Sequence, residues 1–147
     1  MPEKETIRKA RKDKREGKSA STQAGEFVHE EIEHIREGKH GARSTKQAIA
    51  IGLSKARRAG VKLPAPKKGQ ASASTRKQAQ HDLAKAKSHR KPSATRSKAT
   101  RTALKHESRS AASTKALSRQ AKTAARKRSA KSRHNAAVKA ARTRAAH

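Results

Sequence analysis

The stretch STKQAIAIGLSKARRAG, residues 44–60, has the spacing of one amphipathic helix with both of its ends marked. Ser44 and Gln47 stand at the positions of a capping box, in which the two side chains satisfy amides at the helix start. Gly60, with two prolines shortly after it, is typical of a helix end. We therefore predict a helix over residues 45–59.

Small side chains line one face of this predicted helix. Ala48, Gly52 and Ala56 are spaced by four residues and lie on one side of a helical wheel. Side chains this small let the backbone of a second helix approach closely. The preceding segment, residues 22–37, is the predicted partner.

Residues 22–37 show the same helical periodicity. Ser21 or Thr22 is a suitable N-cap, and Gly38 is a suitable residue for the end. Five apolar residues share an arc of roughly 140°, the width of a core-facing stripe: Ala24, Phe27, Val28, Ile32 and Ile35. We predict a helical hairpin over residues 21–63, preceded by a polar arm in residues 1–20 that can be helical from Lys4 to Glu16.

The charge is divided unevenly along the chain. Met1–Glu37 holds nine acidic residues against nine Lys and Arg, whereas residues 38–147 hold 31 Lys and Arg against Asp82 and Glu107. The net charge of +29 therefore lies entirely after Glu37. A polycation of this density is expected to bind a polyanion, and nucleic acid is the most abundant one.

Large apolar residues are too few for a core that includes the whole chain. Leu, Ile, Val and Phe number 14 of 147 residues, and only four of them follow residue 63. Highly charged chains with so few are usually disordered. The predicted fold is all-α: the hairpin, a linker over residues 64–73, and a basic low-complexity tail over residues 74–147. We expect the tail to be disordered or only conditionally helical.

Several function classes are disfavoured by composition. The chain has no cysteine for a disulfide or a cysteine zinc site. No apolar run reaches the length of a signal-peptide core or a membrane span, so we expect a cytoplasmic protein without a membrane partner. So small a core cannot enclose a catalytic cavity, and we expect neither enzyme activity nor a cofactor.

The 44–60 stretch resembles the signature of a family of small basic bacterial proteins of unknown function. Residues 26–41, which end in Arg-Glu-Gly-Lys-His-Gly, are similar to what precedes that signature. The resemblance covers roughly residues 1–66 and implies a short helical unit without implying an activity. The tail separately resembles the C-terminal tails of H1 histones through its composition.

The segment His29-Glu30-Glu31-Ile32-Glu33-His34 is similar to the H-E-x-x-H helix of zinc proteases, but its spacing is longer by one residue. The two imidazoles then point in directions about 140° apart on a helix and cannot share a metal ion. A metal here would need ligands from elsewhere in the chain. We predict no metal site and interpret these residues as a solvated face.

Four glutamates form one line along the first predicted helix, which we call the acidic line: Glu26, Glu30, Glu33 and Glu37. The simplest interpretation is a solvated face that pairs in part with Lys and Arg on the second helix. A second interpretation is an intramolecular decoy that holds part of the basic tail and competes with DNA. A divalent-cation site is the third.

Nucleic-acid binding is the function that the sequence favours, with duplex DNA preferred over RNA and the nucleoid as the expected location. Phe27 is the single aromatic residue, so base stacking is unavailable and affinity must come from phosphates. The expected contacts are basic residues of the second helix, the linker and the tail: Lys46, Lys55, Arg57, Arg58, Lys67, Lys68, Arg119, Lys122, Arg126, Lys127, Arg128, Lys131, Arg133, Lys139, Arg142 and Arg144.

Three alternatives stay open. The hairpin can be a protein-interaction module whose tail only localises it on nucleic acid, or the chain can be a factor associated with RNA or the ribosome. The hairpin can also be a relative of the helix-turn-helix motif, with Lys46, Gln47 and Ser54 as candidates for base contacts. Ile51 falls on the far side of the second helix, where a weak homodimer would cover it. In the leading interpretation the protein is histone-like, and it condenses or bridges DNA without sequence specificity.

Overall fold

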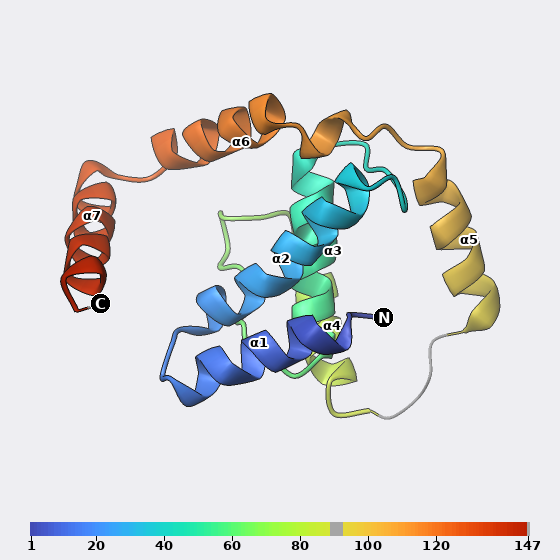
Figure 1. Ribbon diagram of the computed structural model, residues 1–147, viewed down its shortest axis with the longest axis horizontal. Helices are drawn as coiled ribbons and strands as arrows, with labels where there is room; N and C mark the ends of the chain where they lie inside the picture. Colours follow the sequence, from blue (N-terminus) through green and yellow to red (C-terminus); the bar gives the residue numbers. More distant parts are fainter. Residues whose placement is uncertain (89–92, 147) are drawn as a thin grey trace. The chain divides into compact units, whose positions relative to one another are not determined.

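The computed structural model describes residues 1–88 and 93–146, and the regular structure of these residues is helical throughout (Figure 1). The elements in chain order are α1 (Lys4–Arg15), α2 (Ala20–Arg36), α3 (Thr45–Arg58), α4 (Ala73–Lys85), α5 (Ala94–Lys105), the 3-10 helix η1 (Ser110–Ala112), α6 (Thr114–Arg126) and α7 (Ala130–Ala145). The chain forms two compact units, Met1–Ser113 and Thr114–His147. The prediction of an all-α protein is confirmed.

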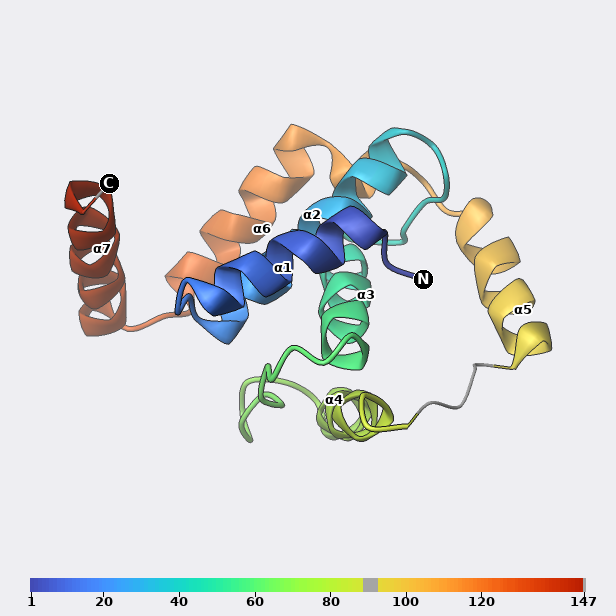
Figure 2. The same ribbon diagram turned by 60° about the horizontal axis from the view of Figure 1, so that its bottom comes forward.

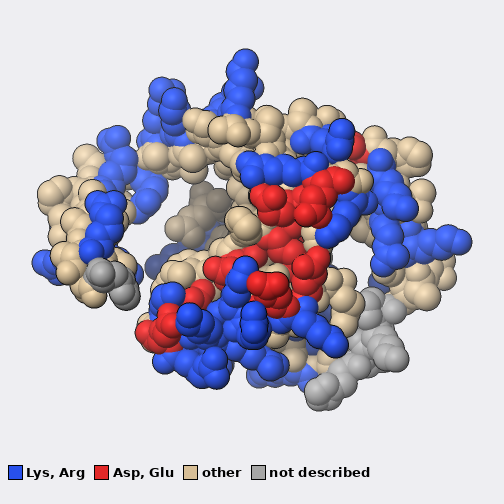
Figure 3. Space-filling model, viewed as in Figure 1, with Lys and Arg blue, Asp and Glu red and all other residues tan. Residues whose placement is uncertain are grey.

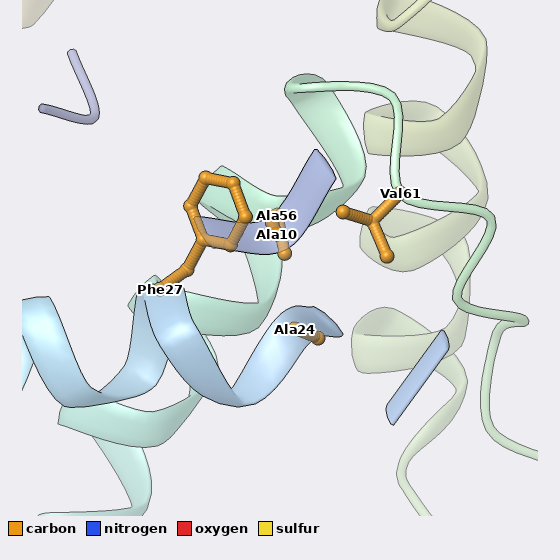
Figure 4. Packing of buried hydrophobic residues seen from close by; sticks show 5 residues of the cluster. All are labelled: Ala10, Ala24, Phe27, Ala56 and Val61. Carbon is orange, nitrogen blue, oxygen red and sulfur yellow. The ribbon is translucent and has the colours of Figure 1, made fainter. Parts of the chain in front are cut away.

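The core of the first unit lies where α1, α2 and α3 meet. Helix α2 crosses α3, and α1 lies against α2 (Figures 1 and 2). Figure 4 shows the buried cluster that joins the three helices and the turn after α3: Ala10, Ala24, Phe27, Ala56 and Val61. Phe27 is 1% exposed and is the one large side chain among alanines and a valine, so the core depends on it heavily.

Helices α2 and α3 approach each other closely at Gly52. A Cβ atom added at this glycine would lie 2.7 Å from Cα of Val28, a distance that real Cβ atoms essentially never show. Ala48 and Ala56, one turn away on either side, are fully buried. The small face of α3 is therefore the contact surface for α2.

The two helices of the hairpin are capped by serines. Ser44 accepts a hydrogen bond from the amide of Gln47 at 3.2 Å, as predicted, and the Gln47 side chain accepts one from the amide of Arg43 at 2.7 Å. Helix α2 begins earlier than predicted. Its N-cap is Ser19, which accepts from the amide of Thr22 at 3.3 Å.

Residues 1–20, expected as a polar arm, contain helix α1, and this helix contributes to the core. Ala10 is buried in the central cluster, and Ile7 packs against that cluster. Asp13 is also buried and accepts a hydrogen bond from Nζ of Lys18 at 2.8 Å. The hairpin is thus completed by a third helix on the α2 side.

The prediction of a disordered or conditionally helical tail is wrong. Four α-helices, α4 to α7, lie between residues 73 and 145. Serines cap three of them: Ser72 accepts from the amide of Thr75, Ser93 from that of Arg96 and Ser129 from that of Ser132. Ala, Lys, Arg and Gln are strong helix formers. Local propensity and caps therefore outweigh the scarcity of large apolar residues on which the prediction depended.

The first tail helix, α4, lies against the C-terminal half of α3 (Figure 2). Its Asp82 is 1% exposed and accepts hydrogen bonds from Oγ of Ser54 at 2.6 Å and from Nε of Arg58 at 2.8 Å. Ala79, one turn earlier on the same face, is also buried. Asp82 and Ala79 form this helix–helix contact, whereas large apolar side chains form it in most helix pairs.

Residues 104–112 dock onto the hairpin through main-chain groups. The amides of Gly41 and Ala42 donate to the carbonyls of Leu104 and Ser108 at 2.8 and 3.0 Å. The hydroxyl of Thr45 donates to the carbonyl of Ala111 at 2.7 Å, and that alanine is buried. A count of large apolar residues along the sequence cannot detect this docking, because the docking depends on backbone amide and carbonyl groups.

The second unit consists of α6 and α7, joined by residues 127–129. Neither helix buries a residue. At the joint, the Arg128 guanidinium donates to the hydroxyl of Ser132 from both Nε and one terminal nitrogen, at 3.2 and 3.1 Å. This unit is therefore two largely solvent-facing helices with a short connection.

Two further expectations concern a homodimer surface at Ile51 and the lack of a membrane-spanning segment. Ile51, on which the expected homodimer depended, is half-buried within the single chain. Among the described helices none combines the length and the hydropathy needed to cross a membrane.

Candidate functional site

The predicted phosphate-binding residues of α3 occupy very different surroundings. Lys46 is exposed. Nζ of Lys55 donates to a carboxylate oxygen of Glu31, and Arg58 is paired with Asp82. Two of these cations are therefore already neutralised by carboxylates of the same chain.

Arg57 is the predicted contact that the structure places farthest from solvent. It is 6% exposed, and its guanidinium donates to the carbonyls of Leu63 and Pro64 at 3.2 and 3.3 Å. Burial lowers the pKa of this guanidinium, and the charge of Asp82 acts in the opposite direction. Arg57 closes the turn that follows α3, so we omit it from the proposed interface below.

Lys67 and Lys68 are exposed in the loop between α3 and α4. The amide of Lys67 donates to the side chain of Gln70 at 3.0 Å, which closes a small turn and leaves both ammonium groups at the surface. These two residues can reach an external phosphate.

The second unit concentrates exposed positive charge. Thr114–His147 contains eleven Lys and Arg and no Asp or Glu. All eleven side chains are exposed: Lys115, Arg119, Lys122, Arg126, Lys127, Arg128, Lys131, Arg133, Lys139, Arg142 and Arg144. Ten of them were predicted as contacts, and Lys115 was missed.

Four of these residues form a single row along α6, which we call the basic row: Lys115, Arg119, Lys122 and Arg126. Their spacing of four, three and four residues keeps them within an arc of roughly 60° on a helix. Leu117 and Ala121 lie on the other side. The i, i+4, i+7, i+11 pattern was visible in the sequence, and it would have identified Lys115 had a helix been predicted there.

The acidic line does not form one uniform surface. Glu30 is buried, and its two carboxylate oxygens each lie 3.3 Å from the backbone amide of Glu3. Glu33 pairs with Arg36 of the same helix at 2.8 Å, and Glu37 pairs with Lys39 at 2.9 Å. Figure 3 shows acidic side chains in a band over the part of the first unit that α1 and α2 form, with Lys and Arg beside them.

Glu3 connects the start of α1 to the end of α2. Its Oε1 lies 2.9 Å from Nε2 of His34 and 3.4 Å from Nζ of Lys39. The hydrogen bonds from His34 and Lys39 hold the pKa of the Glu3 carboxyl below its usual value. The bond to Glu37 in turn raises the pKa of Lys39.

Glu31 is the most deeply buried carboxylate of this region, with a side chain 1% exposed. Besides Lys55, its neighbour is His40 from the loop before α3, whose Nε2 lies 3.1 Å from Oε1 of Glu31. Glu31, His34 and His40 each offer one ligand atom, and the three atoms lie within 4.8 Å of one another. The described residues thus contain one group of side chains able to hold a metal ion.

Residues 4–68 match a family described as a family of unknown function, DUF6496. The matched range contains α1, α2 and α3 together with the loop to Lys68, and it agrees with the expected likeness to a family of unknown function. No curated protein and no solved structure matches the chain. The matched part of the chain is therefore similar to a family for which no activity is described.

Proposed function

We propose that this protein binds nucleic acid through phosphate contacts of its basic helices, with duplex DNA as the main partner and little sequence preference. In this proposal it is histone-like and condenses or bridges DNA in the nucleoid. The observation that carries the proposal is the basic row on α6. It is exposed, it lies in a unit without acidic residues, and its four charges face one direction.

The dimensions of the basic row suit a duplex. From Lys115 to Arg126 a helix extends about 16 Å, at about 1.5 Å per residue. The same length of duplex axis carries about ten phosphates, one per about 1.7 Å. Long, flexible Lys and Arg side chains can therefore each reach a phosphate without bending the helix. Counterion release then makes the affinity strongly dependent on salt.

We expect little sequence preference because the surface lacks large aromatic side chains that could stack on bases. Phe27 is the only aromatic residue of the chain, and it is 1% exposed. The surface therefore has no Phe, Tyr or Trp on which bases could stack, and only His and Arg side chains remain for such contacts. Ser54, one candidate for base contacts in a helix-turn-helix arrangement, donates its hydroxyl to Asp82 instead.

The test is a salt series of binding measurements on the full chain. Fluorescence anisotropy with short duplex DNAs of two unrelated sequences, and with an RNA duplex, gives the affinity and the slope of log K against log salt. We expect equal affinities for the two DNA sequences. Changing all four residues of the basic row to Gln should lower the magnitude of the slope by about 3 to 4, at about 0.9 per phosphate contact.

The matched control exchanges Lys and Arg within the row: Lys115→Arg, Arg119→Lys, Lys122→Arg and Arg126→Lys. It keeps the charge and the helix, so slope and affinity should stay close to those of the unchanged protein. A Gln variant with an unchanged slope would remove α6 from the interface. Absence of binding by the unchanged protein at low salt would overturn the proposed function.

A further inference from the structure

A buried carboxylate oxygen in the first unit lacks the partner that burial demands. Glu31 is fully buried, and its Oε2 accepts a hydrogen bond from Nζ of Lys55. Its Oε1 accepts none from the described residues, although Nε2 of His40 lies only 3.1 Å away. An unsatisfied buried carboxylate oxygen is costly, so something should compensate it.

The hydrogen bond of His40 determines which of its ring nitrogens carries a proton and which has a free lone pair near Glu31. Nδ1 of His40 lies 3.0 Å from the carbonyl oxygen of Gly41, which can only accept, so Nδ1 carries a proton. In a neutral imidazole Nε2 then carries a lone pair and lies 3.1 Å from Oε1 of Glu31. Two electron-rich atoms this close repel each other unless a positive centre, which can be a metal ion or the proton of an imidazolium, compensates them. A metal-bound histidine characteristically donates its other ring N–H to a backbone carbonyl in this way.

His34 supplies a third donor from α2. Its Nε2 lies 2.9 Å from the Glu3 carboxylate, which also only accepts, so the lone pair of His34 is on Nδ1. Glu31 and His34 have the Glu-x-x-His spacing, which places both side chains on one face of a helix and recurs in metal sites of helical bundles. The side chains of both histidines are 14% exposed, so the group lies just beneath the surface.

We propose that Glu31, His34 and His40 form a binding site for a divalent transition-metal ion, with Zn²⁺ as the best-suited ion. Two imidazole nitrogens and one carboxylate oxygen form a donor set that zinc prefers over the harder Mg²⁺ or Ca²⁺. Ligand atoms about 2.0–2.1 Å from a tetrahedral zinc ion stand about 3.3 Å apart, close to the separation of Oε1 and Nε2. The third ligand needs only a modest side-chain movement to complete the set.

The charged side chains around Glu31, His34 and His40 include more carboxylates than cations, which favours the binding of a positive ion. Glu3 and Glu30 add two carboxylates beside His34, and the nearby cations are Lys55 on Glu31 and Lys39 on Glu3. Lys55 holds the second oxygen of Glu31 and so orients the first one toward the histidines. Bound metal would join α2 to the loop that carries His40 and Gly41, and hence to the carbonyl of Leu104 that the Gly41 amide contacts.

The test titrates the full chain, after removal of metal with a chelator, with ZnCl₂ by calorimetry and with CoCl₂ by visible absorption. We expect one Zn²⁺ per chain, a thermal midpoint that rises with zinc concentration, and d–d absorption of Co²⁺ in a site of low coordination number. His34→Ala and His40→Ala should each weaken zinc binding by at least about 100-fold, because loss of an outer partner alone costs 10–100-fold.

His29→Ala is the matched control, since His29 lies on the same helix but is exposed. It should keep the unchanged affinity and the cobalt spectrum. Circular dichroism without metal checks that each variant keeps its helices, and His34→Ala tests the site without altering the loop. Absence of the cobalt bands, or equal loss of affinity in the His29 and His40 variants, would overturn the site. No nucleic acid enters this measurement, so its outcome is independent of the proposed function.

Discussion

Asp82 of α4 accepts a hydrogen bond from Nε of Arg58 of α3 at 2.8 Å, and its carboxylate is almost completely buried. Ser54 and Gln78 donate to the same carboxylate at 2.6 and 3.0 Å. This side chain joins α4, the first helix of the predicted tail, to the hairpin. It is also one of only two acidic residues after Glu37, so its position is a decisive feature of the fold.

We expect Asp82→Ala to detach α4 from α3. Alanine removes the buried acceptor of these hydrogen bonds, while the Arg58 side chain is 46% exposed and remains hydrated, so the loss should cost about 2 kcal/mol. Hydrogen exchange of the α4 amides should accelerate about 30-fold, at 1.36 kcal/mol per factor of ten. Glu5→Ala is the control, because this exposed residue pairs with Lys9 along α1, away from α4. Unchanged protection of α4 would show that the pair does not hold the helix.

Gly52→Ala should destabilise the first unit, although alanine is the better helix former. The added Cβ would lie 2.7 Å from Cα of Val28, so α2 and α3 must move apart. Overpacking of this kind typically costs 1–3 kcal/mol. Gly25→Ala in α2 is the control, since nothing lies within 4 Å of its Cβ position. It should stabilise the chain by up to about 1 kcal/mol. Urea denaturation measures both changes.

Thr45→Val should weaken the docking of residues 110–112. The Thr45 hydroxyl donates to the carbonyl of Ala111 at 2.7 Å in a buried contact, and valine keeps the shape but not the donor. The unsatisfied carbonyl should cost about 1–3 kcal/mol in the free energy of unfolding. Thr95→Val, at an exposed position of α5, should change it little. Equal stabilities of the two variants would contradict docking through this bond.

The Glu3 carboxyl should titrate at a lower pH than a free glutamate, because His34 and Lys39 donate to it. A lowered pKa means that the bond between α1 and α2 is fully present above the usual pKa of Glu, about 4.3. It is lost as the pH falls through the lowered pKa. NMR titration of the side chain measures this directly. In His34→Gln the midpoint should move up toward the ordinary value, and no movement would contradict the assigned cause.

The interpretation that the acidic line restrains DNA binding can be tested with Glu33 and Glu37, whose side chains are 38% and 54% exposed. Glu33→Gln with Glu37→Gln should strengthen DNA binding at low salt and have no effect at high salt, where exposed charges are screened. Any loss of negative charge favours DNA, so Glu5→Gln with Glu16→Gln is the necessary control. If both double variants gain equally in anisotropy titrations, the acidic line has no special role.

The helices of the hairpin could be predicted because their signals are local. The serine cap at Ser44, the glycine after α3 and the small face with Gly52 lie within one stretch, and the structure uses all of them. The wrong prediction for the tail has a definite cause. It counted large apolar residues, whereas α4 and residues 104–112 dock through Asp82, buried alanines and backbone amides.

The candidate sites show the same division. The charge distribution of the sequence pointed to the exposed cations of the second unit, and a helical wheel would have added Lys115. Nothing local distinguished Lys46, which is exposed, from Arg57, which is buried beneath the turn after α3. The group around Glu31 was missed because His40 comes from a loop, whose path a helical wheel does not describe.

By itself the sequence determined the helical character of the hairpin, its capping serine and close-packed face, and the separation of a neutral start from a basic remainder. Propensity, periodicity and charge are properties of neighbouring residues, so they can be read from the order of residues. Only the tertiary structure decided which polar groups are buried together. Thr45 and Ala111 stand 66 residues apart, and Ser54 and Asp82 stand 28 apart. Contacts at such separations depend on the path of the whole chain. Through them the first part of the predicted tail, up to Ser113, belongs to the first folded unit.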